Sequence, residues 1–524
     1  MVQDIVIGSG SAAVAAASAL VDHGRRVLML DVGTTLEPDK RAIRERMGRQ
    51  PPTDWSRADR DALTAVATAG RSETMRPYGS DFLFRVPAAD AGWCTPQQVH
   101  DLRPSFAKGG LSNGWGASIL PYRDADLGGW PIRVADLAPH YAAIARLISA
   151  SGRRDALAPL FPGHALDDEA PLPPSAQAAA LLARLERQRQ PLAALGVHFG
   201  QSRQAIARSC RQCAMCLYDC PYGAIFRAAA VVDRLVAAGA VDYRPDATAV
   251  RFAADDTGVT VRVRSRDGTI DEVRGERLFV AAGVLPTTLL VLDSLDRAGA
   301  PVAIRDSAHF FLPLLHGWST GADPSTEPRH TLAQVFVEIV DPAIAATTVH
   351  TQVYTHNDLF AVDMRRRFGP FADALRPLIG ALSRRLIVAQ SFLHSDLSPH
   401  IEATLVRDGS GARLAFRRRD NAQTATTVAR VRSRLAQVAL KAGMLPLTPL
   451  LRPGTLGSSF HCGGSFPMRA EPGALETDVL GRLPGIDRVH LVDAAVLPTI
   501  PATTIAFSAM ANAHRIATLA CRTR

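Results

Sequence analysis

The feature that most constrains this 524-residue chain is a glycine-rich turn close to its first residue. Residues 4–7 are apolar enough to predict a short buried strand, and the turn that follows has the pattern G-x-G-x-x-A, beginning at Gly8. A helix is expected after the turn, followed by a second strand over residues 26–30 that leads into Asp31. Strand, turn, helix and strand in this order predict a βαβ unit that binds a dinucleotide.

Each position of this turn has a physical reason. Gly8 permits the tight turn, and Gly10 lets backbone N–H groups at the start of the helix, where Ser11 stands, approach a pyrophosphate. Ala13 keeps the helix close to the sheet, and Asp31 can accept a hydrogen bond from a ribose hydroxyl. These five residues are the predicted cofactor-binding residues at this end of the chain. The pattern alone does not separate NAD from FAD.

Composition excludes several classes of protein. Lys and Arg number 59 against 50 Asp and Glu, a net charge of +9, and the chain is 47% apolar, which indicates a globular protein. The basic residues are spread along the chain, whereas a nucleic-acid surface gathers them, so we expect no nucleic-acid partner. The apolar run 278–292 is too short and too interrupted for a transmembrane segment. No secretory signal precedes the first strand, which favours a cytoplasmic location.

The other end of the chain carries a second signal. Within residues 477–515, a predicted strand ends in the pattern V-D-x-A-x-x-P, and a predicted helix contains A-x-A-x-R-x-A. This segment resembles the C-terminal part of the glucose–methanol–choline (GMC) flavin oxidoreductases. In that family the Asp at the strand end lies beside the flavin pyrophosphate and ribityl chain. The resemblance therefore implies FAD, with Asp493, Ala494 and Thr504 among its contacts.

Three further segments match the same family in the correct order. Residues 108–116 resemble its second glycine-rich segment, residues 278–283 resemble the strand that closes the nucleotide sheet, and residues 247–252 lie where a backbone group contacts the adenine. The cofactor contacts implied by these matches are Gly110, Ser112, Asn113, Val250, Ala282 and Gly283.

The resemblance implies an α/β fold, namely a Rossmann-like FAD-binding domain with an inserted α+β substrate domain built on an antiparallel sheet. The FAD-binding domain is assigned to residues 1–50, 95–150, 205–300 and 455–524, and the substrate regions to 51–94, 151–204 and 301–454. Strands are predicted in the last region over 331–339, 347–355, 386–393, 401–407 and 412–417. There Tyr354, His356, Phe392 and His394 are candidate pocket residues, although a packed or surface role is favoured for each.

A cysteine run, within the loop 208–224, is the one motif that the flavin resemblance does not explain. Its spacing, C-x₂-C-x₂-C-x₃-C-P, is that of bacterial ferredoxins and predicts an iron–sulfur cluster, with 4Fe–4S favoured over 3Fe–4S. The predicted ligands are Cys210, Cys213, Cys216 and Cys220. The fourth ligand is open between Cys220, Cys94, Cys462 and none. Zinc held by four thiolates and unmetallated thiols are the alternatives.

The catalytic residues are assigned by resemblance. His461 stands in an H-x-x-G-x-x-x-M-like context and corresponds to the family's histidine facing flavin N5, where a neutral imidazole can take a hydroxyl proton. The family's second position, a His or Asn after a proline-rich turn, is occupied here by Thr503 and Thr504. His514 lies too far along the helix to replace it.

The predicted function is that of a GMC-type, FAD-dependent dehydrogenase. It would oxidise a small-molecule alcohol, with sugars and polyols among the candidates, by hydride transfer to flavin with His461 as base. The cluster would pass electrons to an external acceptor, with a redox protein as one candidate. Two alternatives stay open: an oxidase that uses O₂ and has a metal-free cysteine loop, and a cofactor-bearing electron-transfer or binding protein without alcohol turnover.

Overall fold

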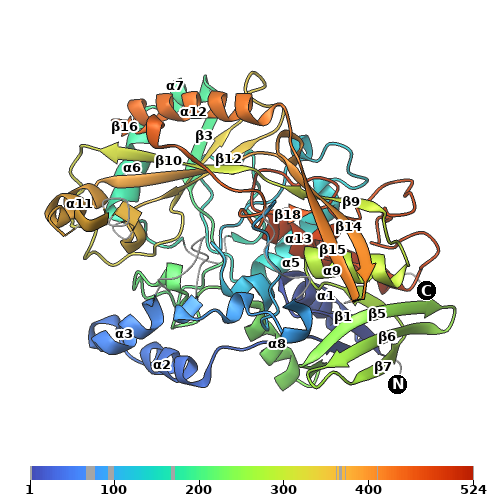
Figure 1. Cartoon of the computed structure of the whole chain (residues 1–524). Coiled ribbons are helices and arrows are strands. Elements are labelled where there is room, and N and C mark those ends of the chain that lie inside the picture. Colours follow the sequence, from blue (N-terminus) through green and yellow to red (C-terminus); the bar gives the residue numbers. More distant parts are fainter. Residues whose placement is uncertain are drawn as a thin grey trace.

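The computed structural model describes residues 3–65, 77–91, 99–166, 171–360, 363–364, 369–371, 373–409 and 411–522. Figure 1 shows a lower part that contains both chain termini and an upper part that contains a broad antiparallel sheet. The chain passes between the two parts several times, so each part is assembled from separated segments.

A five-stranded parallel sheet is the centre of the lower part, in the order β19-β8-β1-β2-β4. Its strands are β1 (Asp4–Ile7), β2 (Val27–Leu30), β4 (Val241–Arg244), β8 (Leu278–Val280) and β19 (Val489–Leu491). Strands β1, β8 and β19 are buried along their whole length, as expected for a parallel sheet covered on both faces. The sheet therefore joins the first, middle and last parts of the chain.

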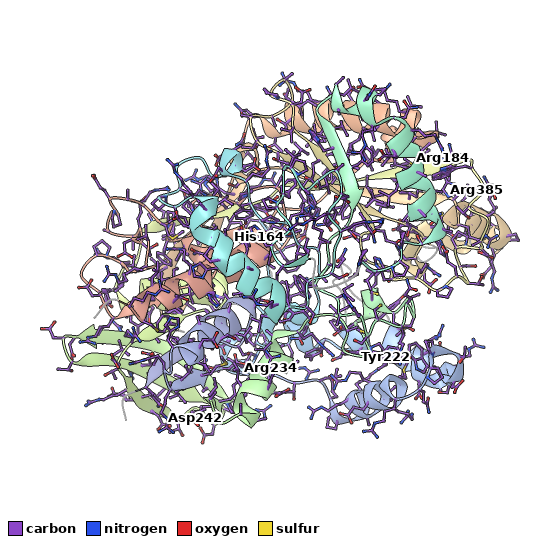
Figure 2. The ribbon with its side chains drawn as sticks, turned by 180° about the vertical axis from the view of Figure 1, so that it is seen from behind. His164, Arg184, Tyr222, Arg234, Asp242 and Arg385 are labelled. Carbon is purple, nitrogen blue, oxygen red and sulfur yellow. The ribbon has the colours of Figure 1, made fainter. Side chains whose placement is uncertain are left out.

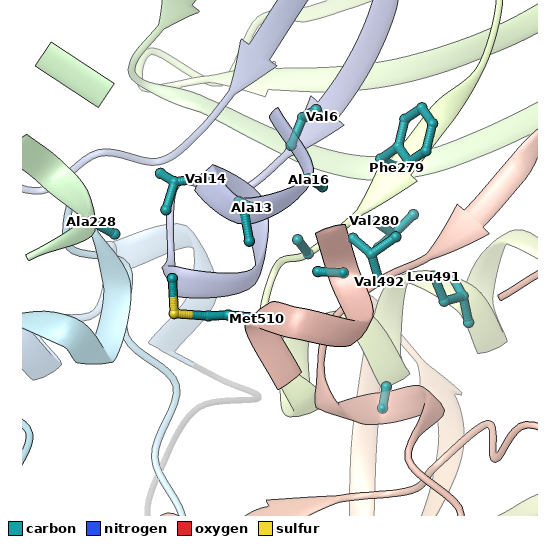
Figure 3. Close-up of a cluster of buried hydrophobic side chains, with 14 of the residues drawn as sticks. Val6, Ala13, Val14, Ala16, Ala228, Phe279, Val280, Leu491, Val492 and Met510 are labelled. Atoms are coloured by element: carbon teal, nitrogen blue, oxygen red, sulfur yellow. The ribbon is translucent and has the colours of Figure 1, made fainter. Parts of the chain in front are cut away.

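Small residues allow the helices to pack closely against this sheet. Helix α1 (Ser11–Asp22) buries five alanine and valine side chains in its first seven positions, and it packs against α13 (Ile505–Ala520). Figure 3 shows Ala13 and Val14 of α1 near Met510 of α13, with Val280 and Leu491 beside them. The other helices of this part are α5 (Val134–Leu147), α8 (Ala228–Ala237) and α9 (Val284–Ser294).

Two smaller antiparallel sheets flank the parallel one. The three-stranded sheet is β5 (Ala247–Asp255), β6 (Gly258–Ser265) and β7 (Ile270–Gly275). The four-stranded sheet, in the order β15-β14-β9-β18, is made of β9 (Pro301–Asp306), β14 (His400–Asp408), β15 (Gly411–Arg419) and β18 (Cys462–Gly463).

The upper part is built on a seven-stranded antiparallel sheet in the order β16-β10-β13-β12-β11-β3, with β17 paired to β10. Its strands are β3 (Val197–Gln201), β10 (His309–His316), β11 (Val335–Ile339), β12 (Val349–Tyr354), β13 (Leu386–Phe392), β16 (Met444–Pro446) and β17 (Arg452–Pro453). Helices α6 (Ala176–Arg187), α7 (Arg189–Ala193) and α12 (Thr424–Lys441) lie over its outer side, and α11 (Arg376–Ser383) lies near one edge.

The two faces of the seven-stranded sheet differ in chemistry, because neighbouring residues along a strand point to opposite faces. One face is apolar and packs against Leu181 of α6 and Leu435 of α12 in a core of its own. The other face, here called the polar face, carries His198, His309, Phe311, Phe336, Glu338, His350, Gln352, Tyr354, Gln390 and Phe392. Glu338, His350 and Gln352 of this face are buried, so part of the chain must cover them.

The predicted fold class is confirmed: a parallel nucleotide-type sheet with helices on it and an α+β part on an antiparallel sheet. The predicted strands over 331–339, 347–355 and 386–393 correspond to β11, β12 and β13. The last two predicted strands form β14 and β15, but these belong to the four-stranded sheet, because β14 pairs with β9. Among the described residues, no helix is long and apolar enough to cross a membrane.

Candidate active site

The glycine-rich turn lies where β1 ends and α1 begins. Gly8 has φ +96°, and a Cβ at this position would lie 2.4 Å from the carbonyl oxygen of Ala281 on the neighbouring strand segment, so only glycine fits. A Cβ on Gly10 would instead meet no protein atom within 4 Å. Ala13 is fully buried against the sheet. Packing within the protein therefore accounts for the small residues at positions 8 and 13, whereas the open space beside Gly10 is suited to a ligand.

Asp31 lies at the end of β2 in a buried hydrogen-bond network. The hydroxyl of Ser9 donates to its Oδ2 at 2.5 Å, and the hydroxyl of Tyr243 donates to the same oxygen at 2.9 Å. Burial raises the pKa of Asp31 to about 6, and these two hydrogen bonds oppose the rise. The Ser9 hydroxyl also accepts from the backbone N–H of Gly109 at 2.8 Å, which ties the two glycine-rich segments together.

A cavity of about 420 Å³ opens beside this network. Four predicted cofactor residues line it: Gly8, Asp31, Val250 and Ala282. Val250 is the residue at which the pairing of β5 with β6 shifts register, so it has no partner in the ladder and its backbone groups are left for another contact. The volume falls within the range of about 300–1,000 Å³ typical of small-molecule and cofactor sites.

The structure adds residues that sequence reasoning missed. Ser105 and Phe106 line the same cavity, and Tyr243 binds Asp31. Ser9 was inside the recognised motif at a position where any residue is accepted, so its link between Asp31 and Gly109 had no sequence signal. Tyr243 is an isolated aromatic residue of β4, and only the pairing of β4 with β2 places it here.

The second glycine-rich segment forms a single helical turn over Gly110–Asn113, directly against the first. A Cβ on Gly110 would approach the Cα of Gly10 at 3.3 Å. The hydroxyl of Ser112 donates to the oxygen of Gly109 at 2.6 Å and accepts from the N–H of Ala228, the first residue of α8. Asn113 donates to two backbone oxygens of its own turn. In this structure Ser112 and Asn113 shape the turn through their side chains.

Asp493 lies just beyond the end of β19 and connects it to the neighbouring strand. Its carboxylate accepts from the N–H of Gly283 at 2.9 Å, the hydroxyl of Thr287 at 2.6 Å and the N–H of Ala495 at 2.9 Å. Burial raises the pKa of Asp493, and these three hydrogen bonds oppose the rise. The sequence did not predict the contact with Thr287, and the predicted contacts of Asp493 and Ala494 with a cofactor stay predictions.

His461 is held at the polar face by a loop that Asp306 anchors. Asp306 accepts from the N–H of Gly457 at 2.7 Å and from the hydroxyl of Ser459 at 2.5 Å, and Ser459 in turn accepts from the N–H of His461 at 2.9 Å. The imidazole stacks on Phe392 with ring centroids 4.8 Å apart. Its Nδ1 is buried and, among the described residues, has no hydrogen-bond partner.

Burial, together with the smaller effects of His350 and His309, lowers the pKa of His461 to about 3. The imidazole is therefore neutral at physiological pH, as a base must be before it accepts a proton. Of the four candidate pocket residues, Phe392 stacks on His461. The hydroxyl of Tyr354 donates to the side-chain oxygen of Gln352, and the hydroxyl of Ser118 donates to the same oxygen. His356 and His394 bond to backbone oxygens of Ser383 and Asp126.

The two threonines proposed for the second catalytic position differ from each other. The hydroxyl of Thr504 accepts from the N–H of Leu120 at 2.8 Å, at the start of α13. The hydroxyl of Thr503 is fully buried and has no partner within the described part of the chain. Only Thr503 therefore has a hydroxyl left unpaired for a ligand, and a hydroxyl cannot accept a proton as readily as an imidazole does.

The four cysteines of the run lie in one loop that packs against α2 (Pro38–Gly48) and α3 (Arg57–Thr64). Tyr222, which follows the run, donates to the backbone oxygen of Gln50 at 2.6 Å and stacks on Trp55. Figure 2 shows Tyr222 above the two blue helices. Cys216 and Cys220 are buried, and Cys210 and Cys213 are half-buried.

Burial raises the pKa of every thiol of the run, that of Cys213 to about 12, and thiols of the run raise one another's pKa values. Backbone N–H groups oppose this rise: that of Gln212, for example, donates to the sulfur of Cys210 at 3.4 Å. Gln212, Ala214 and Asp219 have positive φ angles, an arrangement that turns successive N–H groups inward and recurs at many iron–sulfur sites.

The candidate ligands of the cysteine run do not form a metal site in the described structure. In the part of the chain that the structure describes, no three His, Cys, Asp or Glu side chains are grouped as ligands of a metal ion. Cys462, one candidate for the fourth ligand, donates to Asp306 at 3.3 Å in the loop of His461. Cys94, another candidate, lies outside the described residues. The cluster and its ligands stay predictions.

Comparison with solved structures gives the same fold. The chain resembles pyridoxine 4-oxidase from Mesorbium loti with a TM-score of 0.57 and 16% sequence identity, over 100% of both chains. The shared architecture is a parallel sheet covered by helices, joined to a part built on an antiparallel sheet. No protein-family model matches the sequence, and no curated protein matches it. At this identity the likeness establishes the fold alone.

Proposed function

We propose that the chain is an FAD-dependent oxidoreductase that oxidises a small alcohol to a carbonyl compound. The observation that carries the proposal is the cavity of about 420 Å³ bounded by Gly8, Asp31, Val250 and Ala282, four residues predicted as FAD contacts from separate parts of the sequence. The open space at Gly10 supports the same cofactor, because a pyrophosphate needs close backbone approach at this position.

The residues present supply what such a reaction needs from the protein. FAD, when bound, accepts a hydride from the alcohol carbon. His461 is neutral and accepts a hydrogen bond from the substrate hydroxyl, which makes it the proposed base. Its position among Phe392, His309 and His350 keeps bulk water away from that proton. The many polar groups of the polar face favour a substrate with several polar atoms, such as a sugar, a polyol or a hydroxymethyl heterocycle.

The test is an anaerobic titration of the purified protein with a panel of alcohols. We expect the protein to be yellow, with the absorbance spectrum of oxidised flavin, and at least one alcohol to bleach it. Flavin-containing protein that no alcohol bleaches, but that dithionite does, would support the alternative of an electron-transfer or binding protein. Protein that binds NADH and contains no flavin would contradict the proposal.

Electrons leave the reduced flavin either to oxygen or to another acceptor. The positive φ angles at Gln212, Ala214 and Asp219 and the ferredoxin spacing of the run favour an iron–sulfur cluster that relays single electrons to an external acceptor. Cys210 and Cys213 of the run are only half-buried, as access by an external acceptor requires. The oxidase alternative is favoured by a different observation, because the solved structure of the same fold is named an oxidase.

Metal content decides between these two routes. With a cluster, anaerobically purified protein should contain about three or four irons per chain and give a low-temperature EPR signal. Cys213→Ser should remove the iron and slow the reduction of one-electron dyes without slowing the reduction of the flavin. Cys521→Ser, at a half-buried cysteine outside the run, is the control and should keep the iron. Iron-free protein that reduces O₂ rapidly would establish the oxidase, and stoichiometric zinc would exclude the relay.

A further inference from the structure

His350 and Glu338 form a fully buried acid–base pair on the polar face. Nδ1 of His350 lies 2.7 Å from Oε1 of Glu338, and both side chains have 0% exposure. The two residues are directly opposite each other on β12 and β11, so the register of the sheet fixes their contact. Neither residue belongs to any motif that the sequence shows.

One nitrogen of this pair lacks a hydrogen-bond partner among the described residues. Nε2 of His350 is buried and, in the described part of the chain, has no hydrogen-bond partner. A buried polar atom without a partner costs about 1–3 kcal/mol, so such an atom is retained where a ligand supplies the missing contact. When Nδ1–H donates the hydrogen bond to Glu338, the lone pair of a neutral imidazole is on Nε2. Nε2 of His350 is therefore a hydrogen-bond acceptor without a donor among the described residues.

His350 and His461 lie around the same aromatic ring. Phe392 is directly opposite His350 on one side and His309 on the other, and its ring stacks with all three imidazoles, with centroids 6.1 Å from His350, 5.6 Å from His309 and 4.8 Å from His461. The titratable side chains around His350 are therefore Glu338, His309 and His461.

We propose that His350, oriented by Glu338, is the second imidazole of the substrate site, and that His350 rather than His461 takes the proton of the substrate hydroxyl, onto its Nε2. This inference rests on the proposed function. The alcohol O–H bond would break and an N–H bond would form at His350; FAD, when bound, would supply the acceptor for the hydride of the C–H bond with its electron pair, and a carbonyl group would remain. The positive charge that arises on His350 is balanced by the carboxylate of Glu338. His461 then holds the substrate oxygen from the other side.

This assignment fills the position that the sequence left vacant. Thr503 stands where a second His or Asn is expected, and its hydroxyl can hydrogen-bond a substrate oxygen but cannot store a proton. An imidazole paired with a carboxylate stores one well, because the carboxylate stabilises the imidazolium that forms. Glu338 acts through His350 and is a positioning residue.

The kinetic test uses the flavin-containing protein and stopped-flow reduction by the best alcohol of the panel. His350→Asn should lower the rate constant of flavin reduction by roughly 10²–10⁴-fold, the usual contribution of a general base, with flavin content unchanged. Glu338→Gln, which keeps a hydrogen-bond acceptor and removes the charge, should lower it by about tenfold with little change in KM. Added imidazole should restore part of the rate in His350→Ala.

His316→Asn is the matched control. His316 is also a buried histidine of the seven-stranded sheet, but its ring nitrogens contact Gln177 and the backbone oxygen of Trp318. It should keep the wild-type rate, and imidazole should not change it. Equal losses of rate and of melting temperature in His316→Asn and His350→Asn would overturn the proposal, because they would show that buried histidines serve only packing.

A spectroscopic test does not depend on turnover. In protein labelled with ¹⁵N-histidine, the His350 signal, identified by its loss in His350→Asn, should show a protonated Nδ1 and an unprotonated Nε2. A protonated Nε2 would overturn the inference. If an alcohol reduces the wild-type flavin and His350→Asn is reduced equally fast, the inference fails while the proposed function stands. If no alcohol reduces the wild type, both fail.

Discussion

The two large sheets place functional groups in different ways. At the parallel sheet, the groups that surround the cavity are contributed by turns directly after the strands, and glycine and alanine make the space. At the seven-stranded sheet, the polar groups are side chains in the middle or at the ends of strands, with one residue from each of several strands forming a row. The first arrangement depends on backbone conformation and the second on strand register.

This difference predicts which amino-acid substitutions each sheet tolerates. A backbone-built site depends on residues that have no side chain, so any substitution that adds atoms at the turn changes the fold or closes the cavity. A register-built site depends on side chains whose backbone positions are fixed by the apolar face beneath them, in the core that contains Leu181 and Leu435. Polar-face substitutions should therefore change chemistry much more than folding. Three experiments test this contrast.

The largest effect is expected at the glycine-rich turn, where two neighbouring glycines should behave differently. Gly8→Ala places a Cβ 2.4 Å from the oxygen of Ala281 at φ +96°, so we expect it to lower the free energy of unfolding by about 2–5 kcal/mol and to abolish flavin binding. Gly10→Ala meets no protein atom within 4 Å, so flavin should be lost with little change in unfolding of the flavin-free chain. Urea unfolding and flavin absorbance measure both. Equal unfolding curves for the two variants would contradict the distinction between a packing role for Gly8 and a ligand-binding role for Gly10.

The next effect is expected at the polar face. His461→Ala should lower kcat/KM by roughly 10²–10⁴-fold while flavin content and melting temperature stay within the range of the wild type. Removal of the imidazole also removes a buried nitrogen without a partner, so folding loses little. Steady-state kinetics and thermal unfolding on the same samples check the prediction. A variant with near-normal turnover would show that the ring only packs against Phe392.

The smallest effect concerns Asp31, whose pKa is about 6 in the folded chain against an ordinary value of 3.8. Between these two pH values the folded state keeps a proton that the unfolded state has released, so stability falls as pH rises through this window, by up to about 3 kcal/mol. Asp31→Asn should remove this decline. Urea unfolding of the flavin-free protein from pH 4 to pH 7 measures the difference between the two. Parallel curves for wild type and variant would show that Asp31 ionises normally.

Four of the cofactor residues that the sequence predicted lie together in the structure, and their binding of a cofactor stays a prediction. Gly8, Asp31, Val250 and Ala282 come from three separate segments, and the structure places them around one cavity. This was possible because a tight turn, a close helix and a strand-end carboxylate each require a particular residue type at a fixed spacing. The fold class followed from the same segments.

The register-built half could not be predicted in this way. His350 and Glu338 are twelve residues apart, and nothing in the sequence states that β11 and β12 pair with these two residues opposite each other. A shift of one residue would place both side chains on the apolar face. Asp306 was missed for a similar reason, because its role depends on a loop more than 150 residues later in the chain.

The seven-stranded sheet has its own apolar core on α6 and α12, separate from the core of the nucleotide-binding part. Substitutions that alter the polar face therefore leave the scaffold of the dinucleotide cavity unchanged, and the two halves can diversify at different rates. If the proposed function is correct, single side-chain exchanges on β10 to β13 would change the substrate and leave the part built on the parallel sheet intact. On that proposal, Gln352 and Gln390, which lie opposite each other on β12 and β13, are the positions to vary for altered substrate preference, far in sequence from the first two turns of α1.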